Sequence, residues 1–122
     1  MTMLEPKIYT VLSGTTEITD VVQDRIYPTV LRQNTIYPAI TYTRISGGQV
    51  NSLTGYSNLE SPRIQIDVWG DNYSDVKSLA AAVHTAMGAA TTFGALLESD
   101  QDLYEDDVKI HRVCMDFIVW NN

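Results

Sequence analysis

A strand that leads directly into a helix is encoded in residues 63–87, which read RIQIDVWGDNYSDVKSLAAAVHTAM. Over Arg63–Trp69, apolar and polar side chains alternate, as they do in a strand with one buried face. Over Tyr73–Met87 the apolar spacing changes to three and four residues, which is typical of an amphipathic helix. Asn72 is well placed to cap that helix. The segment therefore predicts a half-buried strand followed by a helix that packs on it.

The flanking sequence extends this pattern over the whole chain of 122 residues, a length that suits one domain. The expected elements, in chain order, are a helix from Pro6 to Gly14, a shorter helix over Thr16–Val22 with Ile18, Val21 and Val22 buried, a strand end at Ile26–Pro28, a strand over Ala39–Ser46, the strand and helix above, a strand within Ala95–Leu103 and a strand over Val108–Trp120. The order α-α-β-β-β-α-β-β predicts an α+β fold: a single domain, with a mostly antiparallel sheet and helices packed on one face.

The charges on two of these strands suggest how they pair. A strand, a helix and a second strand over residues 63–103 predict parallel strands, and the last strand then turns back antiparallel to both. If the last strand lies beside Arg63–Trp69, in a split β-α-β arrangement, one register satisfies two ion pairs. That register places Arg63 opposite Asp116 and Asp67 opposite Arg112.

A long connection separates the strand over Ala39–Ser46 from the strand at Arg63. It spans residues 47–61 and is rich in Gly, Asn, Ser and Thr, which makes it long for a hairpin loop. Loops of this length are usually functional or disordered, so we expect a long flexible loop here. Its candidate contact residues are Val50, Asn51, Ser52, Leu53, Thr54, Gly55 and Tyr56, with Leu53 and Tyr56 as apolar contacts.

The chain is acidic, with 8 Lys and Arg against 15 Asp and Glu and a net charge of −7. Binding to duplex DNA relies on cations that neutralise phosphates, so a DNA-gripping function is disfavoured. Six carboxylates cluster in one segment: Glu98, Asp100, Asp102, Glu105, Asp106 and Asp107. A calcium loop starting at Asp100 would need Gly and Glu where Glu105 and His111 stand. The cluster is interpreted as a solvated acidic surface or as a lumen past which DNA slides without sticking.

Catalytic and metal-binding patterns are scarce in this sequence. Cys114 and His111 form the single nucleophile–base pair worth considering, and three residues apart on a strand they point to opposite faces. One cysteine and two histidines at these spacings match no metal pattern. We therefore expect no cofactor, no metal site and no catalytic residues. A small acidic cytoplasmic enzyme using Cys114 and His111 is the less favoured alternative.

No segment has the character of a membrane span or an export signal. Residues Ser78–Leu97 form an uncharged run of 20, long enough to invite a transmembrane interpretation. The run is dominated by Ala, Thr and Gly and contains His84, which favours a buried helix followed by a loop. Glu5 and Pro6 stand where a signal peptide would be basic and then apolar. We expect folding in a cytoplasm, with no membrane partner.

The ordered set of segments resembles the phage tail-completion family, also called tail-to-head joining or tail-terminator proteins. The resemblance covers almost the whole chain in collinear order, although no single motif is diagnostic. It is carried by Arg25–Pro28, Tyr37–Gly47, Arg63–Trp69, the helix start Tyr73–Asp75, Leu79–Met87, Asp102–Tyr104 and Val113–Trp120.

This resemblance implies a structural virion protein of a long-tailed double-stranded DNA phage or a related particle. It implies a hexameric ring in the neck that caps the tail tube, stops its growth and docks on the head connector, or stopper. In such a ring the loop over residues 47–61 would be a docking loop. DNA would pass through the ring, and no enzymatic activity is implied. The protein would be assembled into the virion in the host cytoplasm. Another neck or tail component, a stopper or a tube subunit, is the alternative within the same class.

Overall fold

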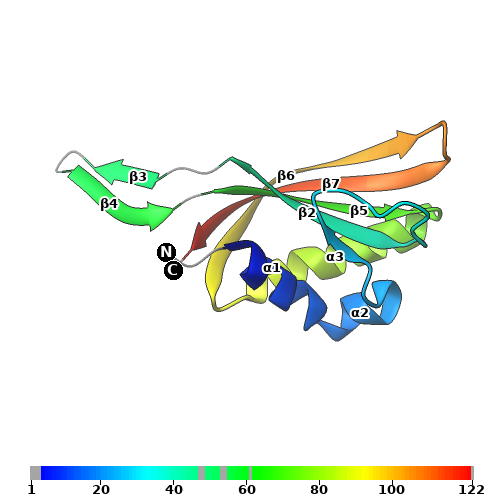
Figure 1. The fold of residues 1–122 in the computed structure, drawn as a ribbon, viewed down its shortest axis with the longest axis horizontal. Coiled ribbons are helices and arrows are strands. Elements are labelled where there is room, and N and C mark those ends of the chain that lie inside the picture. The colour runs from blue at the N-terminus through cyan, green and yellow to red at the C-terminus, as the bar shows by residue number, and fades with distance from the viewer. Residues whose placement is uncertain (1–3, 47–48, 53–54, 61, 122) are drawn as a thin grey trace.

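The described residues form a mixed sheet with helices packed on one face (Figure 1). The computed structural model describes residues 4–46, 49–52, 55–60 and 62–121. In chain order the elements are α1 (Leu4–Ser13), α2 (Thr16–Val22), β1 (Ile26–Pro28), β2 (Ala39–Ser46), β3 (Gln49–Ser52), β4 (Gly55–Glu60), β5 (Arg63–Gly70), α3 (Tyr73–Ala89), β6 (Phe93–Glu105) and β7 (Ile110–Asn121). The predicted α+β fold and its element order are confirmed.

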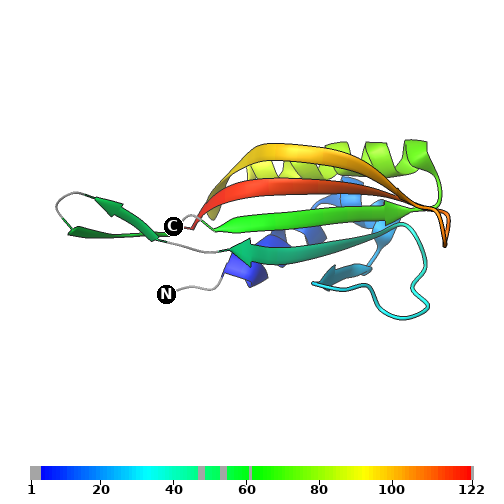
Figure 2. The ribbon, with the colours of Figure 1, turned by 90° about the horizontal axis from the view of Figure 1, so that it is seen from above.

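The main body of the sheet runs in the order β1-β2-β5-β7-β6. β1 and β2 are parallel, and the other neighbours are antiparallel. Because β5 and β6 are both antiparallel to β7, they run parallel to each other, with α3 as the connection between them. The predicted split β-α-β arrangement is therefore confirmed. Figure 2 shows β1 and β6 at opposite edges, with the helices behind the sheet.

Helix α3 joins the helical layer to the sheet. Its N-terminus is capped as predicted, because the Asn72 side-chain oxygen accepts a hydrogen bond from the backbone N–H of Asp75 at 3.1 Å. Its apolar stripe is buried against the inward residues of the central strands: Val76, Leu79, Val83 and Met87 on the helix, Ile64, Ile66 and Val68 on β5, and Val113, Met115, Phe117 and Val119 on β7.

Helices α1 and α2 complete the helical layer. Ile8 and Leu12 of α1 and Ile18 and Val22 of α2 are buried in the same core. Val21, however, is 39% exposed, so its predicted burial is wrong. In a helix of only seven residues, Ile18 and Val22 already occupy the face toward the core, and their neighbour points to solvent.

The predicted pairing of β5 with β7 is right in neighbour and direction but wrong in register. Arg63 lies opposite Ile118 and Asp67 opposite Cys114, a shift of two residues. A two-residue shift keeps every side chain on its own face, so the alternation of apolar residues does not distinguish the two registers. The observed register pairs Ile64 with Phe117 on the buried face. The predicted register would also have paired Ile64 with an apolar residue, Met115, so neither the apolar pattern nor the two charge pairs fixes the choice between the registers.

Residues 47–61, predicted as a loop, contain two strands that the sequence analysis did not anticipate. β3 continues β2 and β4 leads into β5, and the two pair as an antiparallel ribbon. Glu60 at the end of β4 pairs with Asn121 of β7. The ribbon extends beyond the end of the helical layer (Figure 1). These segments lack the apolar alternation that identifies a half-buried strand, which is why sequence patterning missed them.

Candidate assembly surfaces

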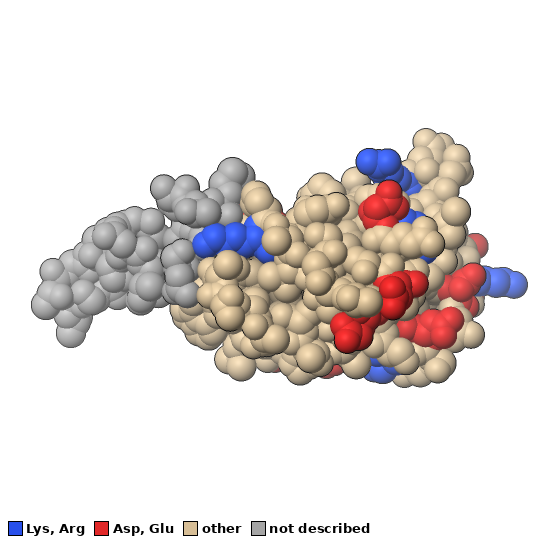
Figure 3. Space-filling model, turned by 90° about the horizontal axis from the view of Figure 1, so that it is seen from below, with Lys and Arg blue, Asp and Glu red and all other residues tan. Residues whose placement is uncertain are grey.

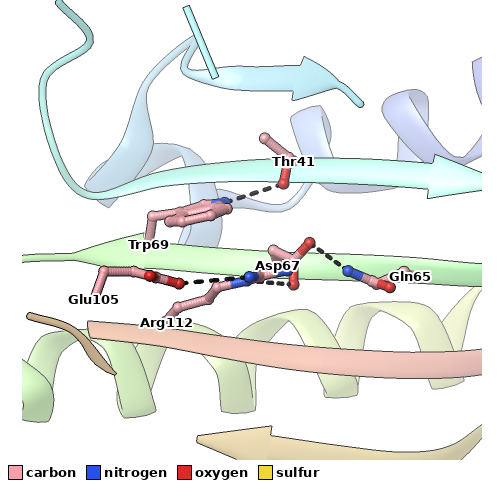
Figure 4. Close-up of polar contacts among 6 residues, drawn as sticks. All are labelled: Thr41, Gln65, Asp67, Trp69, Glu105 and Arg112. Carbon is pink, nitrogen blue, oxygen red and sulfur yellow. Dashed lines mark hydrogen bonds and ion pairs between the residues drawn. The ribbon is translucent and has the colours of Figure 1, made fainter. Parts of the chain in front are cut away.

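The face of the sheet that the helices leave uncovered is here called the bare face. It carries the outward residues of β5 and β7, because residues directly opposite one another on antiparallel strands share a face. One of them, Asp67, is a buried carboxylate. Its oxygens accept hydrogen bonds from Arg112 Nε at 3.1 Å and Gln65 Nε2 at 2.8 Å (Figure 4). The predicted contact between Asp67 and Arg112 thus exists, formed diagonally across the shifted register.

Arg112 links this carboxylate to an aromatic ring and to the β6–β7 turn. Its guanidinium carbon lies 4.7 Å from the centre of the Trp69 ring, and Nη1 lies 3.7 Å from Glu105 Oε1. The Trp69 indole N–H donates to the Thr41 hydroxyl at 3.0 Å. Figure 4 shows these side chains crossing β2, β5 and β7 on the bare face. The network therefore ties three strands together and leaves Asp67 with a cationic partner.

A shallow pocket on the bare face lies beside this network. Its walls include Val30 from the β1–β2 connection and Ile45 from β2, and Trp69 and Arg112 also line it. Val30 and Ile45 are 68% and 50% exposed. The sequence analysis missed this pocket, because residues between β1 and β2 carry no periodic pattern that would place them over the sheet. The bare face therefore combines a polar centre with exposed apolar side chains.

The acidic segment is divided between two faces by the alternation of β6. Glu98 and Glu105 contact cations of the bare face: Arg63 Nη2 donates to Glu98 Oε1 at 2.8 Å, and Glu105 faces Arg112. Asp100 and Asp102 lie opposite the buried residues Met115 and Val113, which places them on the helical side. Asp106 and Asp107 are exposed in the β6–β7 turn. The six carboxylates thus do not form one surface.

On the helical side, Asp102 is held by two residues of α3. Lys77 Nζ lies 3.1 Å from Asp102 Oδ1, and the Tyr73 hydroxyl donates to Oδ2 at 2.9 Å. These hydrogen bonds, that of Lys77 foremost, lower the pKa of Asp102. The acidic strand therefore also fastens the start of α3 to the sheet.

Further acidic side chains gather on the helical face, toward the end at which α2 lies (Figure 3). Glu17 and Asp20 of α2 and Asp24 after it are exposed. A face with this charge repels phosphates, in keeping with the acidic composition.

The docking-loop residues lie only partly within the described part of the chain. Leu53 and Thr54 fall outside it, and for Val50, Asn51, Ser52, Gly55 and Tyr56 the structure describes the backbone alone. Asn51 lies opposite Tyr56, and Ser52 opposite Gly55. Their role as contacts therefore stays a prediction.

Cys114 and His111 lie on opposite sides of the sheet. Cys114 is opposite Asp67 on the bare face, whereas the His111 ring contacts Tyr73 of α3, with ring centres 5.5 Å apart. Burial, aided by a hydrogen bond to Asp67 and its charge, raises the pKa of the Cys114 thiol to about 12. A thiol that is protonated at neutral pH is a poor nucleophile. The geometry therefore gives the Cys114–His111 enzyme no support.

The described part of the chain holds no group of three or more His, Cys, Asp or Glu side chains arranged to bind a metal ion. None of its helices combines the length and apolar character needed to cross a bilayer.

Residues 6–121 match the family described as "Tail completion protein gp17". The chain belongs to this tail-completion family. The resemblance identified from the sequence is thereby confirmed. Members are structural proteins of phage-like particles, so the tail-completion protein is a virion tail component and not an enzyme.

Among solved structures, the tail-completion protein is similar to a chain in the virion of a native gene transfer agent particle. The TM-score is 0.75 at 16% identity, and the match covers 97% of this chain and 93% of that one. Two structures from Akkermansia muciniphila, one described as lacking its transmembrane region, have TM-scores of 0.38 and 0.42 at 11% and 8% identity. They cover 65% and 69% of this chain and 43% and 41% of those chains. No curated protein sequence matches.

Proposed function

We propose that the tail-completion protein forms a hexameric ring that caps the tail tube, stops its growth and joins the tail to the head. The match to the tail-completion family over residues 6–121 carries this proposal. Its partners are further copies of the chain, the tail tube protein on one side and the stopper protein of the head connector on the other. DNA passes through the ring without specific binding.

The charge of the bare face supports passage of DNA. Four of its carboxylates, Asp67, Glu98, Glu105 and Asp116, stand against two guanidinium groups, Arg63 and Arg112. Both guanidiniums are already engaged by carboxylates, Arg63 by Glu98 and Arg112 by Asp67. Cations held in this way are poorly available to phosphates. A lumen lined by such a face lets the genome slide rather than bind.

The β3–β4 ribbon supports docking to a partner. An isolated two-stranded ribbon is only marginally stable in water, and this one extends past the helical layer (Figure 1). Packing against another protein would stabilise it. We assign Val50–Tyr56 to this contact, with Leu53 and Tyr56 as its apolar side chains.

The copy number and shape of the purified assembly test the proposal. Native mass spectrometry is expected to give a particle of six chains, each of 13.6 kDa, and negative-stain images are expected to show closed rings. Added to polymerising tube protein of the same particle, the rings should arrest tube growth. Open-ended tubes would indicate a tube subunit, closed rings of another copy number would indicate a stopper, and monomers at all concentrations would overturn the proposal.

A further inference from the structure

The sheet has two open edges, on opposite sides of the molecule (Figure 2). On one side, β6 pairs with β7 and with no other described strand. On the other side, β1 covers β2 only from Ile40 to Tyr42, so Thr43–Ser46 has β5 as its one described partner strand. Open edges expose N–H and C=O groups that accept a further strand. Each edge is therefore a template for pairing with another chain.

The β6 edge is unusually long for an edge strand. It spans thirteen residues, whereas strands in globular proteins have about 5–6 residues. Isolated proteins usually shorten, twist or cover such an edge. In β6 the edge is protected by its carboxylates. Their negative charge repels a second acidic edge but allows pairing with a neutral or basic one.

The charges of the two edges are complementary. Asp100 is exposed on β6, and Arg44 is exposed on β2. Within the described part of the chain, neither side chain forms an ion pair. Asp100 lies opposite buried Met115 and Arg44 opposite buried Ile64, so both project on the helical side of the sheet. Two sheets joined edge to edge with their helices on the same side would bring these charges together.

The strand directions also suit such a junction. β2 runs antiparallel to β6, because successive neighbours across β5 and β7 alternate in direction. Rotation about an axis along the strands preserves these directions, so β6 of one copy meets the β1–β2 edge of the next in antiparallel orientation. Through Ile64 and Phe117, Arg44 lies level with Leu97, three residues from Asp100. That offset is about 10 Å, which the tilt of strands in a closed barrel supplies.

We propose that the partner of each open edge is a second copy of this chain: the β6 edge of one copy pairs with the β1–β2 edge of the next, and Asp100 faces Arg44 across the junction. The contact is head to tail, so repeating it around a ring gives the open stretch of every β2 a partner strand. The bare faces then line the lumen and the helices lie outside. This inference rests on the proposed ring and specifies which surfaces build it.

Charge reversal tests the junction in the full chain. Arg44→Glu and Asp100→Arg are each expected to raise the concentration required for half-maximal ring assembly by about tenfold or more, because every junction then opposes like charges. The double variant restores opposite charges in every junction, and its assembly is expected to return to within about threefold of the wild type. The exposed control variant Asp20→Arg, on α2, should assemble as the wild type does.

The possible outcomes separate this inference from the proposed function. If the wild type forms rings and both single variants assemble normally, the junction is overturned and the ring stands. The same holds if the double variant assembles no better than either single variant. A wild-type protein that forms no ring would overturn the ring and the junction together.

As a second measurement, Arg44→Cys and Asp100→Cys in a Cys114→Ser background should yield ladders of linked chains with a short thiol cross-linker. If intact rings gave no linked chains, the proposed contact would be refuted.

Discussion

At the scale of single residues, Asp67 stands out as the buried charged side chain of the described residues. It is buried, and its partner Arg112 is itself largely covered. Removing one member of a buried pair leaves the other without compensation, which costs more than the pair contributes. The Arg112–Glu105 contact, at 3.7 Å and with Glu105 half exposed, differs in this respect. The two carboxylates thus provide a matched comparison around one guanidinium.

Asp67→Asn is expected to lower the free energy of unfolding by about 2–4 kcal/mol, because Arg112 loses its buried counter-charge. Glu105→Gln, the control, is expected to cost less than about 1 kcal/mol, since exposed ion pairs contribute little. Urea unfolding followed by Trp fluorescence measures both. Equal losses for the two variants would show that burial does not govern this site.

Cys114→Ser is expected to leave folding and ring assembly unchanged at neutral pH, because the thiol has no chemical role. In the wild type the folded-state pKa of Cys114, about 12, lies above the ordinary value of 9.0. The folded protein therefore holds a proton that the unfolded chain releases, and stability falls as the pH rises from about 9 toward 12.

The loss of stability with rising pH should be smaller in Cys114→Ser, because serine does not titrate in this pH range. Urea unfolding between pH 7 and pH 10.5 tests the difference. Identical pH profiles for the two proteins would contradict the assigned shift, and a loss of particle infectivity with normal folding would reopen a chemical role for the thiol.

At the scale of elements, the β3–β4 ribbon extends beyond the helical layer, and β6 carries exposed carboxylates along an open edge of the sheet. The ribbon continues the β2–β5 pair beyond the helices, and β6 alternates its carboxylates between two faces. Changes to either element should therefore affect assembly more than folding.

Replacing Val50–Tyr56 with a tight turn should preserve the fold, because the entropy of loop closure changes only slowly with length. The ring should fail to form or fail to dock on the tube. Circular dichroism checks the fold, and native mass spectrometry with a tube-capping assay checks function. A shortened protein that still forms rings and still completes tails would refute the docking role.

Replacing all six carboxylates of Glu98–Asp107 with amides should leave the domain folded, since such surface charges contribute little individually. Paired variants locate the lumen. Glu98→Gln with Glu105→Gln removes charge from the bare face and should let assembled rings retain DNA at low salt. Asp100→Asn with Asp102→Asn removes charge from the helical side and should not. If only the Asp100→Asn, Asp102→Asn variant retained DNA, the lumen would lie on the helical side and not on the bare face.

At the scale of the whole molecule, the tail-completion protein has the modest core expected of 122 residues, with two open sheet edges. Assembly that covers those edges stabilises the folded state by mass action. The melting temperature is therefore expected to rise with protein concentration. Arg44→Glu should weaken that dependence, whereas Asp20→Arg should not. Differential scanning fluorimetry over a hundredfold concentration range provides the test, and a constant melting temperature for the wild type would contradict it.

The amino-acid sequence by itself determined the fold class, the element order, the split β-α-β arrangement and the inward faces of β5 and β7. These follow from local rules: the apolar period, the Asn72 cap and the short connections that limit topology. Membership of the tail-completion family was also readable, because its segments recur in order along the chain.

Tertiary structure alone decided the register of β5 with β7, the exposure of Val21, the ribbon within residues 47–61 and the division of the acidic segment between two faces. For the register, the ribbon and the acidic segment the physical reason is the same. Local patterns indicate which residues prefer burial. Two registers that differ by two residues have the same apolar pattern, however, and polar segments have no apolar pattern at all. Packing across strands distant in the sequence is what selects among them.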